Sequence, residues 1–216
     1  MQNDIVQMTQ QRYGYGLWAA PYWFIGLEEG MANQDRDTLD KTMKCWRDLG
    51  SRELDDCRQF HRCLGEERWH GAKPRLQPTW RPLMLLLMTF TQQECTKADL
   101  REYQRERWGA SDGVTCVIEL SGAAASNLMV ERDRGDDLLD PRISHIRERL
   151  REHQPRFVVM YGASQKWQEL TGRYVAADDI AKVGSTLMVR TKHPTSRGST
   201  NQHWQDLGDK LRAQVT

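Results

Sequence analysis

Four short runs of apolar residues, rich in β-branched and aromatic side chains, predict buried β-strands. Segments with a helical period separate these runs. Strands that alternate with helices form parallel sheets whose two faces are covered, so the pattern predicts an α/β fold. The expected strands cover residues 22–27, 114–120, 156–161 and 185–191.

The same periodicity predicts the main helices. Residues 37–49 place Leu39, Met43 and Trp46 on one face, which is the stripe that an amphipathic helix buries. The C-terminal segment has a similar stripe and follows Ser199 or Thr200, either of which is a good N-cap. Two further helices are expected over residues 141–153 and 164–170.

Residues 57–80 show no clear hydrophobic period, which predicts a long irregular excursion. The next segment, residues 81–107, has a helical period and is split near Thr96. No internal repeat, low-complexity segment or Pro/Gly/Ser linker divides the sequence. We therefore expect a single domain over residues 1–216 that carries an irregular and helical insertion at residues 57–108.

Composition narrows the class of protein. The 31 Lys and Arg residues nearly balance the 30 Asp and Glu residues, so any DNA-binding surface must come from local clustering of charge.

The most apolar stretch, residues 82–90, is about half as long as a membrane-spanning helix. Residues 1–12 lack the basic start and apolar stretch of a signal peptide. We expect a cytoplasmic protein without membrane contact.

The cysteines are odd in number and include no C-x-x-C pair. This pattern indicates neither a disulfide framework nor a zinc or iron–sulfur ligand set. We therefore expect reduced thiols, no metal and no organic cofactor. The five residues are Cys45, Cys57, Cys63, Cys95 and Cys116.

Motifs at the ends of all four expected strands occur in an order typical of one family. They read FIGLEEG at residues 24–30, CVIELS at residues 116–121, PRFVVMYGAS at residues 155–164 and HPT at residues 193–195. In this order they resemble the motifs of the uracil-DNA glycosylase superfamily, and they are spread over nearly the whole chain. The third motif matches the family strand that is followed by Gly and a small residue, and the last matches H-P-[ST].

Two positions differ from the family pattern. Glu29 stands where most members have Pro, and Glu28 stands where several have Asp or Asn. The cysteine pattern of the cluster-binding branch is also missing from the sequence. The resemblance implies a three-layer αβα sandwich with a central four-stranded parallel sheet. It also implies a monofunctional DNA N-glycosylase that releases a pyrimidine and leaves an abasic site.

The chemistry of that reaction explains the residue types. Hydrolysis of an N-glycosidic bond builds positive charge on the sugar and negative charge on the departing base. Glu28 supplies an anion near the anomeric carbon, and Glu29 shares or replaces that role. His193 donates a hydrogen bond to a pyrimidine carbonyl oxygen as charge accumulates there. We expect these three residues to be catalytic.

The remaining candidates hold the flipped nucleotide and its DNA. A carboxylate accepts a hydrogen bond from the exocyclic amino group of cytosine, so Glu119 favours a modified cytosine as the base. An aromatic face is expected to stack on the base. The base-binding candidates are Glu119, Gly26, Gly30, Trp80, Tyr22 and Trp69. The candidates for binding DNA phosphate are Thr195, Ser196, Arg197 and Ser164.

Several alternatives stay open. Glu28 and Glu29 are also typical of solvated turn acids, His193 of a structural hydrogen bonder and Glu119 of an ion-pair partner. The chain also fits a plain uracil-DNA glycosylase, a catalytically silent DNA-binding member of the family or, least well, a nucleotide hydrolase. The resemblance implies one of two biological roles, which are base-excision repair and the removal of hypermodified cytosine from phage DNA. In either role we expect a bacterial monomer that binds double- or single-stranded DNA.

Overall fold

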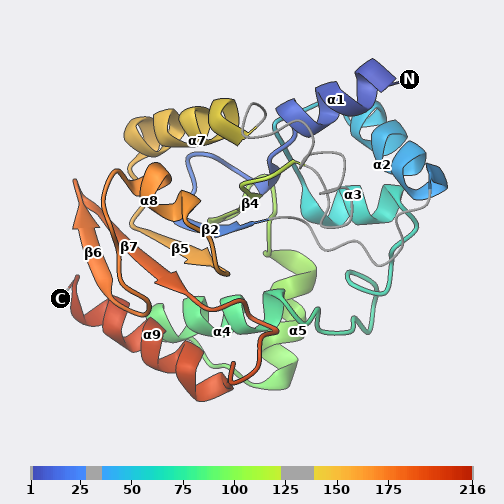
Figure 1. Cartoon of the computed structure of the whole chain (residues 1–216). Coiled ribbons are helices and arrows are strands. Elements are labelled where there is room, and N and C mark those ends of the chain that lie inside the picture. Colours follow the sequence, from blue (N-terminus) through green and yellow to red (C-terminus); the bar gives the residue numbers. More distant parts are fainter. Residues whose placement is uncertain (1, 28–35, 123–138, 216) are drawn as a thin grey trace.

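The computed structural model describes residues 2–27, 36–122 and 139–215. These residues form an α/β fold around one mixed sheet of seven strands, in the order β3-β1-β4-β2-β5-β7-β6 (Figure 1). The strands are β1 (Gly14–Gly16), β2 (Tyr22–Gly26), β3 (Leu54–Asp55), β4 (Thr115–Glu119), β5 (Phe157–Tyr161), β6 (Ile180–Val183) and β7 (Thr186–Thr191).

The four predicted strands, β4, β2, β5 and β7, are neighbours in the middle of this sheet. β2 pairs with β4 and β5, and β5 pairs with β7, in each case in parallel. The strand predictions are confirmed, but the prediction of a four-stranded parallel sheet is wrong. β1 joins β4 and β6 joins β7 in antiparallel orientation, and β3 pairs with β1. These three strands are too short to show an alternating pattern in the sequence.

Four of the helices match the predicted ranges, namely α2, α7, α8 and α9. The insertion also divides as predicted, since α5 begins after Thr96, which forms a capping box with Asp99. α1 is not predicted by the sequence. The described helices are α1 (Gln2–Gln11), α2 (Arg36–Asp48), α3 (Cys57–Cys63), α4 (Trp80–Phe90), α5 (Lys97–Glu106), α7 (Leu139–His153), α8 (Lys166–Thr171) and α9 (Asn201–Ala213).

The prediction that residues 57–80 are irregular throughout is wrong at their start. Cys57–Cys63 forms α3, whose N-cap Asp56 accepts a hydrogen bond from the Gln59 backbone N–H. With only seven residues, α3 is too short for its hydrophobic period to stand out. The chain then continues without a regular helix or strand as far as Thr79.

Helices cover both faces of the sheet (Figure 1). On one face, Ile146 of α7 and Trp167 of α8 pack in one core cluster with Ile25 of β2. On the other face, Leu86 of α4 belongs to a second cluster that includes Phe24 of β2. Because neighbouring side chains of a strand point to opposite faces, β2 contributes to both clusters. None of the helices in the described ranges has the length and apolar composition needed to cross a membrane.

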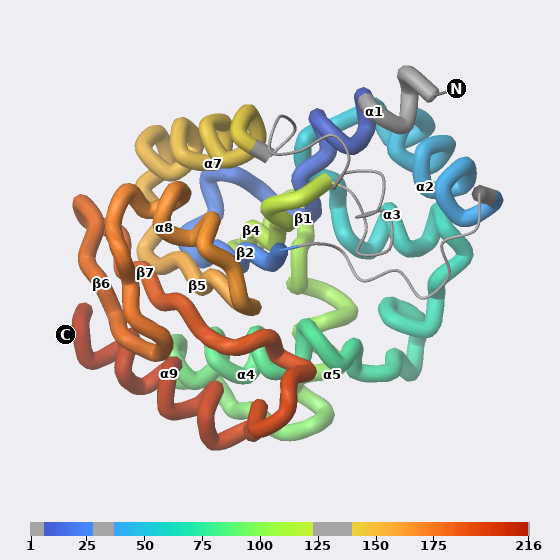
Figure 2. The backbone as a smooth tube through the Cα atoms, in the orientation of Figure 1, coloured from blue at the N-terminus to red at the C-terminus, as the bar shows by residue number. Residues whose placement is uncertain are grey.

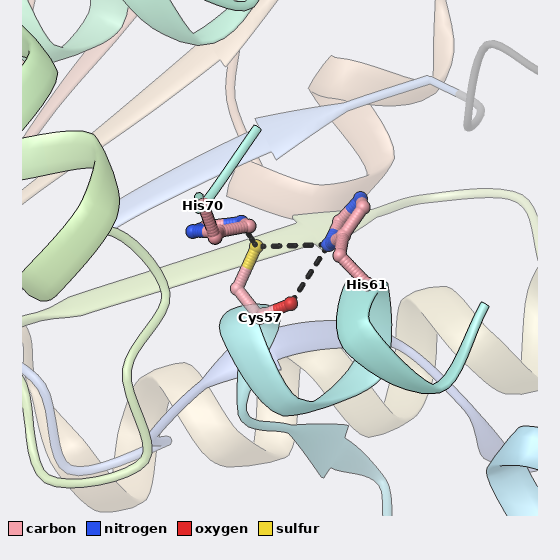
Figure 3. A group of neighbouring side chains, drawn as sticks. All are labelled: Cys57, His61 and His70. Carbon is pink, nitrogen blue, oxygen red and sulfur yellow. Dashed lines mark hydrogen bonds between the residues drawn. The ribbon is translucent and has the colours of Figure 1, made fainter. Parts of the chain in front are cut away.

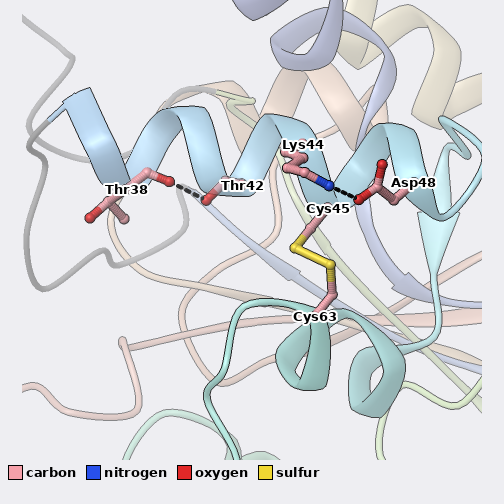
Figure 4. Close-up of a disulfide and its surroundings, with 6 residues drawn as sticks. All are labelled: Thr38, Thr42, Lys44, Cys45, Asp48 and Cys63. Carbon is pink, nitrogen blue, oxygen red and sulfur yellow. Dashed lines mark hydrogen bonds and ion pairs between the residues drawn. A yellow bond between two sulfur atoms is a disulfide. The ribbon is translucent and has the colours of Figure 1, made fainter.

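A disulfide joins Cys45 of α2 to Cys63 of α3, with their Cα atoms 5.7 Å apart (Figure 4). This overturns the expectation that all thiols are reduced. The two cysteines belong to no short motif, and only the packing of α2 beside α3 brings them together. Disulfides are common in oxidising compartments and rare in the cytosol. The cytoplasmic location stays a prediction.

We predict that reduction of this disulfide lowers the free energy of unfolding by about 3 kcal/mol, because the bond closes a loop in the unfolded chain. The two cysteines are 18 residues apart in sequence. Urea unfolding with and without a phosphine reductant measures the difference. The Cys45→Ala/Cys63→Ala variant should be insensitive to reductant, and Cys95→Ala should respond like the wild type. A wild-type midpoint that does not move contradicts the bond.

Candidate functional site

The carboxyl ends of the four central strands meet at one edge of the sheet. Gly26 at the end of β2 pairs with Glu119 at the end of β4, and Tyr161 at the end of β5 pairs with Thr191 at the end of β7. Figure 2 shows β2, β5 and β7 side by side, with the chain after β7 leading toward α9. Sites in parallel α/β sheets form at such an edge.

A hydrogen bond crosses the end of β2. The Tyr161 hydroxyl donates to Oε1 of Glu119 over 3.1 Å, although the two residues belong to strands on either side of β2. Gly26 lies between them. A Cβ at this position would lie 2.1 Å from Oε2 of Glu119 and 2.6 Å from the Tyr161 hydroxyl. The missing side chain of Gly26 therefore makes room for the bridge.

His193 joins this group from the turn after β7. Its ring meets the ring of Tyr161 edge to face, with the centroids 5.7 Å apart. The turn is held by Ser196, whose backbone N–H and hydroxyl donate to the His193 carbonyl oxygen over 2.9 and 2.7 Å. Glu119, Tyr161 and His193 thus form a connected row along the edge of the sheet. We call Gly26, Glu119, Tyr161 and His193 the strand-end cluster.

The hydrogen bonds of His193 define its tautomer. The Thr195 backbone N–H donates to Nδ1 over 3.2 Å, and the Thr195 hydroxyl lies 2.9 Å from the same atom. A backbone N–H only donates, so Nδ1 is an acceptor and the neutral ring carries its proton on Nε2. Burial lowers the pKa of His193 below its usual 6.5. At neutral pH the ring is an uncharged donor through Nε2.

The candidate phosphate-binding residues flank this cluster. Thr195 and Arg197 are exposed on the turn after His193, and Ser196 is half-buried. Ser164 follows β5, and its hydroxyl accepts a hydrogen bond from the Lys166 backbone N–H at the start of α8. The hydroxyls of Thr195 and Ser196 serve the His193 turn, so exposed Arg197 has the freest approach to a phosphate.

The stacking candidates are not brought into the strand-end cluster. Tyr22 lies at the opposite end of β2 from Gly26, roughly 13 Å away along an extended strand, and packs against Phe90 and Phe157. Trp80 is only 8% exposed. The Arg68 guanidinium covers one face of Trp69 at 4.7 Å.

Three of the predicted residues, Glu28, Glu29 and Gly30, lie outside the described residues. Of the others, the structure brings Gly26, Glu119 and His193 together. Tyr161 has no role in the sequence prediction, although it stands at the end of a predicted strand. The sequence does show a tyrosine at a strand end. Its hydrogen-bond partner, Glu119, can be identified only from the folded structure.

No protein-family model matches the chain, and no curated protein matches it at a significant level. Membership of the uracil-DNA glycosylase superfamily therefore stays a proposal. It rests on the motifs and on the geometry of the strand-end cluster.

We predict that His193 titrates with a pKa below 6.5, because burial disfavours the imidazolium and protonation of Nδ1 breaks the hydrogen bond from Thr195. An NMR titration of the imidazole signals measures this pKa, and His193→Gln assigns the signal. The folded state binds this proton less readily than the unfolded state. The free energy of unfolding therefore falls as the pH drops below 6.5 through the folded-state pKa. A measured pKa of 6.5 or more contradicts the burial of the His193 ring that lowers its pKa.

Proposed function

We propose that the protein is a DNA glycosylase of the uracil-DNA glycosylase superfamily, which hydrolyses the N-glycosidic bond of a flipped, modified pyrimidine. One observation carries the proposal. An uncharged imidazole donor, a carboxylate and a phenol hydroxyl converge on the end of a glycine-terminated strand. This arrangement fits the carboxyl edge of the central parallel strands, where this superfamily is expected to bind the extruded nucleoside.

His193 stabilises the departing base. When the bond to the sugar breaks, the pyrimidine leaves as an anion whose charge is shared with its carbonyl oxygen. The Nε2–H of His193 donates to that oxygen and strengthens its hydrogen bond as the charge grows. Its Nδ1 is held by Thr195, so the donor is oriented before the reaction begins. A donor of this kind is worth about 10² to 10³ in rate.

A carboxylate stabilises the positive sugar and orients the attacking water. Glu28 is proposed for this role because it follows Leu27, the residue that continues β2 beyond Gly26. The Leu27 carbonyl accepts a hydrogen bond from the Ser121 backbone N–H over 2.7 Å, which fixes the exit of β2 beside β4. Glu29 is the alternative carboxylate.

Glu119 is proposed to select the base. A carboxylate accepts a hydrogen bond from the exocyclic amino group of cytosine, whereas uracil presents a carbonyl oxygen at the same place. The Tyr161 hydroxyl orients Glu119 and offsets part of its negative charge through a charge-assisted hydrogen bond. This reduces the repulsion between Glu119 and the departing anion. We therefore propose a modified cytosine as the preferred substrate.

The proposed reaction needs DNA as the partner and serves two biological roles. Removal of a damaged cytosine belongs to base-excision repair, and removal of a hypermodified cytosine from phage DNA belongs to defence. The second candidate function is a silent member of the superfamily that binds DNA without cleaving it. The departure from the family pattern at Glu29 favours that alternative.

We predict that the wild type forms abasic sites in duplex or single-stranded DNA that carries the preferred pyrimidine. His193→Ala should lower the rate about 10²- to 10³-fold, because the leaving base loses its donor. Glu28→Gln, as a separate single variant, should abolish most of the wild-type activity. Alkaline cleavage of the abasic product in a gel assay measures both rates.

His153→Ala is the matched control, because His153 lies at the end of α7 and packs near Trp23. It should keep the wild-type rate. If the wild type binds DNA but forms no abasic product from any substrate, the result contradicts catalysis and favours the silent DNA-binding member of the superfamily.

We predict that cytosine derivatives modified at C5 are released faster than uracil, and that Glu119→Gln narrows this preference because an amide both donates and accepts. Tyr161→Phe removes the hydroxyl that orients Glu119. Like Glu119→Gln, it should reduce the preference for modified cytosines over uracil. Competition between duplexes that carry uracil, cytosine and modified cytosines, read by mass spectrometry of released bases, gives the ratios. Clean release of uracil with none of the cytosines overturns the assignment of Glu119.

A further inference from the structure

A second group of reactive side chains lies outside the strand-end cluster. Cys57 and His61 are four residues apart on α3 and share one face of that helix (Figure 3). His70 comes from the irregular segment after α3 and faces the same sulfur. One ligand atom from each residue lies within 4.8 Å of the other two. We call these three residues the Cys-His-His cluster.

The two sulfur–nitrogen distances match the corresponding edges of a tetrahedral zinc site. Nδ1 of His61 and Nε2 of His70 lie 3.5 and 3.6 Å from the Cys57 sulfur. A tetrahedral Zn²⁺ ion, with a Zn–S bond of about 2.3 Å and Zn–N bonds of about 2.0–2.1 Å, sets each S···N edge at about 3.6 Å.

The surroundings of the cluster are aromatic and largely closed to solvent. Cys57 is fully buried and His61 is 8% exposed. The His61 ring meets the rings of Tyr15 and Trp80, with centroids 5.4 and 5.2 Å away. Gly109 approaches so closely that a Cβ there would lie 2.9 Å from the Cys57 Cβ. An apolar shell of this kind limits the access of water to a metal site.

We propose that Cys57, His61 and His70 bind one Zn²⁺ ion, with water in the fourth position. Thiolate and imidazole are the donors that Zn²⁺ prefers. The cluster ties α3 to the segment that leads to α4, so the ion orders a part of the chain that has little regular structure. This site goes beyond the proposed glycosylase activity and does not depend on it.

Binding of the ion requires two changes in protonation. The thiol of Cys57 loses its proton and becomes a thiolate. His61 Nδ1 lies 2.7 Å from the Cys57 carbonyl oxygen and donates to it, so the ring proton moves to Nε2 when Nδ1 binds the metal. Binding of one Zn²⁺ therefore releases one proton, and affinity falls as the pH is lowered.

The sequence predicts no metal at these positions, because their spacing fits no recognised zinc motif. The pair of ligands on one helical face becomes visible only once α3 is known to be a helix. His70 adds the third donor through the path of the following segment.

We predict that the full chain, with its disulfide intact and treated with a chelator and then dialysed, binds one Zn²⁺ per chain. Saturating Zn²⁺ should raise Tm by about 5 to 10 °C at a hundredfold excess over Kd. Co²⁺ should give the thiolate charge-transfer absorption and the intense d–d bands of tetrahedral coordination. Calorimetry in two buffers measures the release of one proton.

Cys57→Ser and His70→Gln should lose these signals, whereas Cys95→Ser and His153→Gln should keep them. Circular dichroism of each variant checks that the fold is retained. His70→Gln changes a half-buried residue of an irregular segment, so it tests the site even if Cys57→Ser does not fold. Equal Zn²⁺ binding by His70→Gln and wild type overturns the proposal. Absence of Zn²⁺ binding, or binding of Cu⁺ alone, overturns it as well.

Discussion

The parallel alignment of β4, β2, β5 and β7 is the constraint on which the candidate site depends. It brings the ends of four strands that are far apart in the sequence to one edge of the sheet. At the centre of that edge, Gly26 has no side chain, so Glu119 and Tyr161 reach across β2 and form a hydrogen bond. His193 completes the row because Thr195 and Ser196 fix the turn that carries it.

The chain stabilises its least regular part by different means. Residues 64–79 form no helix or strand, and their neighbour α3 has only seven residues. The Cys45–Cys63 disulfide joins α3 to α2, while the Cys-His-His cluster connects α3 to the segment that follows it. A disulfide and a group of contacting side chains thus link a region with little secondary structure to α2 and α3, whereas the sheet positions the candidate site.

The sequence predicts those helices and strands whose hydrophobic pattern extends over enough consecutive residues to be recognised. The four central strands and helices α2, α7 and α9 have clear hydrophobic periods, and Gly172 marks the end of the short helix α8. β1, β3, β6 and α3 are shorter than the windows in which such periods are visible. Glu119 and His193 stand in strand-end motifs that the sequence displays, whereas the hydrogen bond from Tyr161 to Glu119 is a tertiary contact without a local signal. Tyr22 lies at the opposite end of β2 from Gly26, because a strand carries its two ends to opposite edges of the sheet. The disulfide has no local signal.

The central claim is that the strand-end cluster receives an extruded pyrimidine whose carbonyl oxygen accepts a hydrogen bond from His193. It is tested most directly by NMR of ¹⁵N-labelled imidazoles during titration with a duplex that carries one 2′-fluoro-2′-deoxycytidine, whose glycosidic bond resists cleavage. The account predicts a downfield shift of the His193 Nε2–H signal, with that of His153 unchanged. Saturable binding of the duplex that leaves the His193 signal in place would contradict it.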